Sequence, residues 1–149
     1  MAQKQTQDWM VMMEDWFTKL PPLPKGGKDA IVQITPWVAL IFGILGVLGG
    51  LAGIGLLTAL SPFMAISNGL GGAAGGLIGA AFGLAASAIL LAAFPGTSKR
   101  QMRGWTLLFW SEALSAVASV LSIGTNGAIG LLVALVGFYL LFQIKSYYK

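Results

Sequence analysis

The chain has 149 residues, of which 56% are hydrophobic and 9% are charged, and its mean hydropathy is +0.81. A soluble domain carries roughly 25% charged residues, so this composition excludes a water-soluble globular protein and predicts a single membrane domain. The sequence contains neither cysteine nor histidine, which excludes disulfides, thiolate metal sites and histidine bases, and we expect no metal, no cofactor and no enzymatic activity.

The N-terminal segment is predicted to form an amphipathic helix over residues 5–20, with Thr6 as its N-cap. Its apolar side chains recur at helical spacing and form one stripe, which comprises Trp9, Met12, Met13, Trp16, Phe17 and Leu20. Two interpretations stay open. The helix is either a passive anchor in the membrane interface, where tryptophan is favoured, or a contact surface for a partner subunit.

A proline-rich linker follows this helix. The segment Pro21-Pro22-Leu23-Pro24 ends the helix and predicts a stiff connector, and Asp29 is expected to cap a short helical run through Ile34. We therefore divide the chain into a cytoplasmic or interfacial segment over residues 1–35 and a membrane domain over residues 36–149.

Four apolar segments are predicted to cross the membrane, at about residues 36–60, 70–94, 105–123 and 128–144. The first begins near Pro36, the second is stopped by Pro95-Gly96, and the third ends at Gly124. The short connections on one side predict antiparallel neighbours. The predicted fold class is an all-α integral membrane protein, a four-transmembrane-helix bundle with an N-terminal amphipathic interfacial helix.

The basic residues lie on one predicted side of the membrane. They are Lys4, Lys19, Lys25, Lys28, Lys99, Arg100, Arg103, Lys145 and Lys149, whereas the connections over residues 61–68 and 125–127 carry no charge. This asymmetry predicts that both termini are cytoplasmic. The basic residues are dispersed around apolar segments, which argues against nucleic-acid binding. The layout resembles that of many small bacterial membrane proteins, and this resemblance implies a bacterial-type inner membrane without implying a function.

Glycine is abundant, with 21 residues, and it recurs at helical spacing in three of the predicted spans. The stripes are Gly43, Gly46, Gly50 and Gly53, then Gly72, Gly76, Gly79 and Gly83, and finally Gly130 and Gly137. Missing side chains let helix backbones approach closely in lipid, so we interpret these glycines as helix-packing positions. The stripes face each other within one chain or face other copies, and a surplus face with Gly49 and Gly75 is expected to be left for a partner.

The third span carries a polar stripe formed by Glu112, Ser115, Ser119 and Ser122. At 1.5 Å per residue, Glu112 is expected about 10 Å below the cytoplasmic interface. A polar stripe facing lipid is unfavourable, so it should face the bundle or a cavity. One hypothesis makes it a candidate ion or proton site. The other is structural, with Glu112 hydrogen-bonded locally or reaching Arg103 or Lys99, and with the serines bonded to carbonyls of their own helix.

These patterns favour a small polytopic membrane protein with a structural or assembly role. The expected partners are the lipid bilayer and either further copies of the chain or other membrane protein subunits, held through glycine-rich helix packing. The alternative function is a small channel or a proton- or cation-coupled transporter that uses Glu112 and the three serines.

Overall fold

The computed structural model describes residues 2–121 and 125–149, with the side-chain surroundings of all of these except residues 2, 3, 6, 65, 68–73, 125 and 126. The helices are α1 (Ala2–Thr18), α2 (Lys25–Ser98), α3 (Met102–Leu121), α4 (Thr125–Ile144) and a short 3-10 helix, η1 (Lys145–Tyr147). Four segments are long and apolar enough to cross a membrane, namely Lys25–Met64, Ala74–Ser98, Met102–Leu121 and Gly127–Tyr147. The predicted all-α membrane fold with a short N-terminal helix is confirmed.

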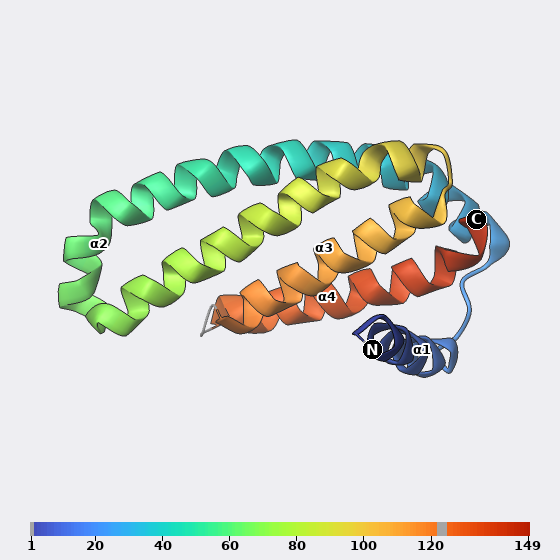
Figure 1. The fold of residues 1–149 in the computed structure, drawn as a ribbon, viewed down its shortest axis with the longest axis horizontal. Helices are drawn as coiled ribbons and strands as arrows, with labels where there is room; N and C mark the ends of the chain where they lie inside the picture. The colour runs from blue at the N-terminus through green and yellow to red at the C-terminus, as the bar shows by residue number, and fades with distance from the viewer. Residues whose placement is uncertain (1, 122–124) are drawn as a thin grey trace.

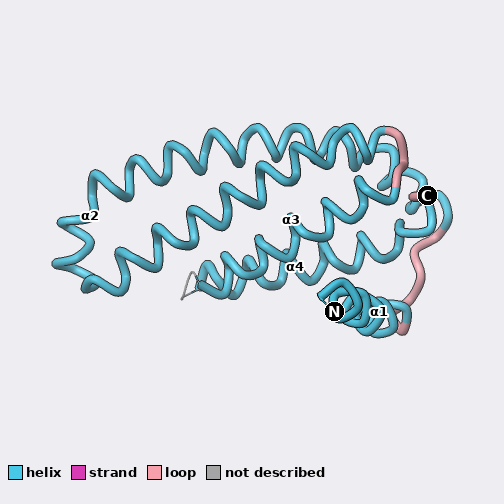
Figure 2. The backbone as a smooth tube through the Cα atoms, viewed as in Figure 1, coloured by secondary structure: helices cyan, strands magenta, loops and turns pink. Residues whose placement is uncertain are grey.

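The helix α2 folds back on itself, so that its first limb (Lys25–Met64) lies antiparallel to its second limb (Ala74–Ser98) (Figure 1). The prediction of a loop over residues 61–68 was wrong, because helical structure continues through the bend (Figure 2). The hydroxyls of Thr58 and Ser61 donate to the carbonyls of Ile54 and Thr58, at 2.7 and 2.8 Å. Helical hydrogen bonds satisfy backbone groups within the segment, which is favoured where water is scarce.

Prolines that were expected at helix ends lie inside α2. The helix begins at Lys25, so Pro36 and the expected cap Asp29 are both interior. It also continues past Pro95 to Ser98, and the Lys99 N–H donates to the Pro95 carbonyl at 3.3 Å. Proline removes only its own N–H, and its carbonyl still accepts a helical bond, so the chain can complete another turn.

The remaining boundaries differ by a few residues from those predicted. Because α1 begins at Ala2, Thr6 is an interior residue and not the N-cap. The helices α3 and α4 begin at Met102 and Thr125, three residues earlier than predicted in each case. The predicted end of the third span at Gly124 lies outside the described residues.

The core lies at the end of the bundle that holds the C-terminus. Trp105 was expected at the membrane boundary, but its side chain is only 1% exposed, and its indole N–H donates to the Leu141 carbonyl at 2.8 Å. Its ring packs against those of Phe109 and Phe142, with centroids 5.8 and 5.7 Å apart. Tyr148 is buried in the same cluster. A tryptophan can enter a core when its N–H finds a partner, as it does here.

The C-terminus, the linker before α2 and the connection between α2 and α3 lie at the same end of the bundle (Figure 1). The C-terminal residue is joined to that connection, because the Lys149 N–H donates to the Arg100 carbonyl at 3.0 Å and the Met102 N–H donates to the Lys149 carbonyl at 2.8 Å. The fold therefore gathers the basic connection and the basic C-terminus at one end. Which side of a membrane this end faces remains a prediction.

Candidate functional site

A groove of about 510 Å³ lies between the first limb of α2 and α4. Its walls are apolar and include Val38 and Phe42 from α2 and Val133 and Leu140 from α4. Glu112 of α3 reaches the same groove and, among the residues that the structure describes, is the only charged one that lines it. The fold thus places the single acidic residue of the predicted spans in an apolar groove between two helices that are far apart in sequence.

The Glu112 carboxyl lies against the backbone of α4 at Gly137. A Cβ added at Gly137 would lie 2.7 Å from the Glu112 Cδ, so a larger residue at this position would require the carboxyl to move. Within residues 2–121 and 125–149, the ion pairs are Lys19–Asp15 and Lys145–Glu14, and no hydrogen bond reaches the Glu112 carboxyl. The expectation that Glu112 pairs with Arg103 or Lys99 is therefore not met. Its oxygens stay available to a ligand in the groove.

One serine of the predicted polar stripe, Ser119, lies at a contact between two helices. Ser119 donates its hydroxyl to the Ser115 carbonyl at 2.9 Å, within α3, and it lies against Gly130 of α4. Ser122 lies outside the described residues. Two described members of this stripe face α4, because Glu112 lies over Gly137 and Ser119 over Gly130.

Ser111 was missed by the sequence analysis. It is 4% exposed and donates its hydroxyl to the Ala86 carbonyl at 2.8 Å, which joins α3 to the second limb of α2. A single serine beside Glu112 but off the polar stripe carried no periodic signal. Only the partner carbonyl on another helix reveals its role.

The glycines of the first predicted stripe face the second limb of α2 at three positions. A Cβ would lie 2.7 Å from Leu91 at Gly43 and 3.1 Å from Leu84 at Gly50, and it would overlap Ser87 at Gly46. The fourth member, Gly53, faces open space. At these three positions, the atoms that an added Cβ would meet belong to the same chain.

The second predicted glycine stripe is less uniform. Gly79 is buried, Gly83 faces open space, and a Cβ at Gly76 would make an ordinary contact with Leu57 at 3.9 Å. The surroundings of Gly72 lie outside the described residues. Another close approach, between Gly96 and Gly104, was missed because these two glycines flank the basic connection and belong to no stripe.

The N-terminal helix α1 crosses the bundle next to α4 (Figure 1). Only part of the predicted apolar stripe contacts the bundle. Met13 and Phe17 pack against the core, together with Met10, which the sequence analysis did not place on the stripe. Trp9 and Trp16 remain 71% and 73% exposed, and Met12 and Leu20 are also exposed. The stripe is wide enough for one edge to meet the bundle while the other faces outward.

Contacts between distant parts of the sequence fix α1 in this position. The rings of Phe17 and Phe142 stack with centroids 5.4 Å apart, and Glu14 forms an ion pair with Lys145. Just after the helix, the Tyr139 hydroxyl donates to the Pro21 carbonyl at 2.6 Å. The amphipathic helix is therefore docked on its own bundle, a third possibility beside the two that its sequence suggested.

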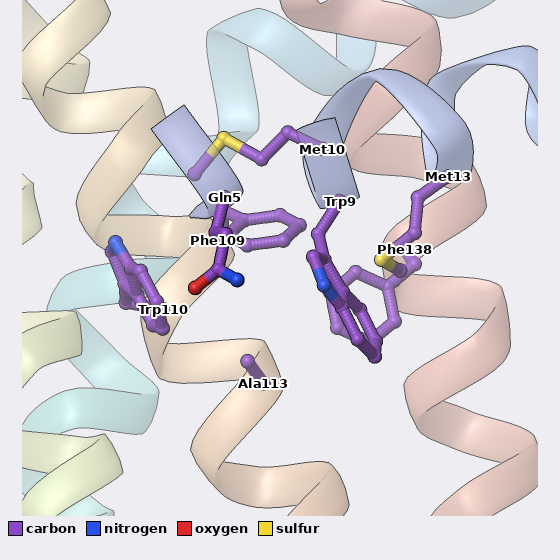
Figure 3. A pocket seen from close by; sticks show the side chains of 8 residues that line it. All are labelled: Gln5, Trp9, Met10, Met13, Phe109, Trp110, Ala113 and Phe138. Carbon is purple, nitrogen blue, oxygen red and sulfur yellow. The ribbon is translucent and has the colours of Figure 1, made fainter. Parts of the chain in front are cut away.

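A second hollow, of about 400 Å³, lies beneath α1 (Figure 3). Its lining is mostly aromatic and sulfur-containing, and consists of Gln5, Trp9, Met10, Met13, Phe109, Trp110, Ala113 and Phe138. In this view Trp9 and Met13 of α1 point toward Phe138, and the Gln5 amide lies between Trp9 and Trp110. In the part of the chain that the structure describes, no group of acidic residues could hold a metal ion.

No protein-family model, curated protein or solved structure was found to match this chain. The four membrane-length helices identify a small multi-span membrane protein.

Proposed function

We propose that this protein is a non-enzymatic membrane protein that associates with further copies of itself through the first limb of α2. The observation that supports this proposal is that Gly49 and Gly53 face open space, although three neighbouring glycines are used within the chain. Their spacing of i, i+4 puts both on one side of the helix, in the small-xxx-small pattern by which membrane helices associate.

The surroundings of these two glycines suit a helix-helix contact. The larger side chains Leu45 and Leu56, one turn away on either side, are exposed and apolar. A second helix could approach the backbone at Gly49 and Gly53 and be flanked by these leucines, and van der Waals contact would replace lipid. The proposed membrane is a bacterial-type inner membrane, with both termini in the cytoplasm.

The proposal is tested by the native mass of the protein in a mild detergent. We expect a discrete homo-oligomer for the wild type, and a monomer for the double variant Gly49→Leu/Gly53→Leu, in which two large side chains separate the backbones. Gly55→Leu is the matched control, because Gly55 also faces open space but lies on another side of the helix. It should keep the wild-type mass. A monomeric wild type, or an unchanged mass of the double variant, would refute self-association.

The alternative function as an ion channel or transporter has less support. A cation path needs several oxygen ligands or more than one titrating group. The hydroxyl of Ser119 is used inside α3, and Glu112 lies against Gly137 with no second carboxylate beside it in the described groove.

A further inference from the structure

We infer that the groove at Glu112 binds a lipophilic amine, meaning a protonated amine carried on an apolar body, which enters from the bilayer. This inference goes beyond the proposed self-association. It concerns the N-terminal part of the first limb, around Val38, whereas the proposed contact lies further along at Gly49 and Gly53. The two proposals can fail separately.

The size and lining of the groove match a small-molecule site. Its volume of about 510 Å³ falls within the roughly 300–1,000 Å³ typical of ligand pockets. Such pockets are mostly apolar, with a few polar groups that fix the orientation of the ligand. In this groove the apolar walls come from α2 and α4, and the polar groups are Glu112 and Thr35.

The charge of the ligand follows from what surrounds Glu112. Among the described residues, no basic side chain lines the groove, and both ion pairs lie elsewhere, at Asp15 and at Glu14. A carboxylate among apolar side chains is unfavourable unless it is paired and hydrogen-bonded. An ammonium group supplies both the opposite charge and N–H donors, whereas an anionic ligand would be repelled.

The hydroxyl of Thr35 is the other polar group of the groove. It donates to the Ile31 carbonyl at 2.6 Å, within the first limb, so toward a ligand it can act only as a neutral acceptor. Glu112 is the acceptor that also carries the charge opposite to that of an ammonium group.

The route into the groove is lateral. Val38, Phe42 and Val133 line the groove and are exposed on the outside of the bundle, so a ligand dissolved in lipid can reach Glu112 between α2 and α4. Entry through the water-facing end would require the charged group to pass the buried residue Ile144, which also lines the groove. The apolar body of the ligand would remain against the apolar walls.

The test uses the full chain in lipid nanodiscs and 4-phenylbutylamine as the probe, with binding to empty nanodiscs subtracted. We expect saturable binding of the amine and at least tenfold weaker binding of 4-phenylbutanol, which has the same body without the charge. Glu112→Gln should weaken amine binding about tenfold or more, as expected for the loss of a charged hydrogen-bonding partner. Asp15→Asn is the matched control, because Asp15 is an exposed carboxylate on α1, and it should bind as the wild type does.

A second variant tests the site without changing the carboxylate. Val38→Trp should fill the groove from the α2 side and also weaken amine binding at least tenfold, while thermal unfolding shows that the bundle is intact. The inference is overturned if the amine shows no saturable binding, if the alcohol binds as well as the amine, or if either groove variant keeps the wild-type affinity.

Discussion

Gly96 and Gly104 allow the second limb of α2 to meet α3 backbone to backbone. A Cβ added at Gly96 would lie 2.7 Å from the Gly104 Cα, and a Cβ at Gly104 would overlap Gly96 and Thr97. The atoms in the way are backbone atoms, so no side-chain rotation relieves the overlap. Thr97 is itself buried at this crossing. The turn between these helices follows directly, because the Gln101 N–H donates to the Gly96 carbonyl at 2.8 Å and the Gly104 N–H donates to the Gln101 carbonyl at 2.9 Å.

Replacement of Gly104 by alanine should therefore destabilise the bundle. Overpacking of a close contact costs about 1–3 kcal/mol, and we expect a loss of this size in the free energy of unfolding. The measurement is denaturant or thermal unfolding in a mild detergent.

Gly55→Ala is the control for this substitution, because Gly55 lies in the same protein in an open helical position. Alanine should be neutral there or stabilise by up to about 1 kcal/mol. Equal stability of Gly104→Ala and Gly55→Ala would show that the Gly96–Gly104 approach is not a constraint.

At the scale of the element, α1 joins the bundle by one edge of its apolar stripe. Phe17 stacks on Phe142, while its neighbour Trp16 points outward and is 73% exposed. Glu14 lies on the same docked edge, and its partner Lys145 also lies 5.2 Å from the centroid of the Trp105 ring. Docking of α1 is thus coupled to the aromatic core through Lys145.

Phe17→Ala should loosen α1, and Trp16→Ala should not. Loss of a partly buried aromatic side chain and its stacking partner removes about 1–3 kcal/mol of docking free energy. Amide hydrogen exchange across α1 should then accelerate about tenfold or more in Phe17→Ala, with the rest of the bundle unchanged. If exchange in α1 accelerates equally in both variants, the docked face has been assigned wrongly.

The sequence allowed prediction of the helices but not of which helices pack against one another. Long apolar segments with few charges specify membrane helices, so the spans were located to within a few residues, apart from α2. In α2, three features were interpreted as helix boundaries, namely Pro36, Pro95 and residues 61–68, because proline and polar residues end helices in water. Near a bilayer, helical hydrogen bonding is favoured, and α2 continues through all three.

The candidate site was predictable only in part. Glu112 can be recognised from the sequence alone, because it is an acidic residue inside an apolar span. That Val38 and Val133 would form the walls around it depends on how α2 and α4 meet across α3, and no local pattern contains that information. The same holds for Ser111 and for the choice between Trp16 and Phe17 as the docked side chain of α1.

At the scale of the whole molecule, the path of the chain brings basic residues together at one end of the bundle. The C-terminus and the basic connection between α2 and α3 share one end, and Lys149 is hydrogen-bonded to Arg100 there. The opposite end holds the bend of α2, where Phe63 and Ile66 are exposed and no charged residue occurs. In a membrane, basic residues are retained on the cytoplasmic side, so this polarity predicts the orientation of the bundle.

Orientation can be measured with single cysteines, because the natural chain contains none. In Ile66→Cys, the thiol lies at the bend of α2, and a membrane-impermeant maleimide should label it in intact cells. In Lys99→Cys, the thiol lies at the opposite end and should be labelled only after the membrane is permeabilised. Both positions are exposed, so a difference in labelling reports the side of the membrane and not burial. The reverse pattern would place both termini outside and show that the basic residues do not determine the topology.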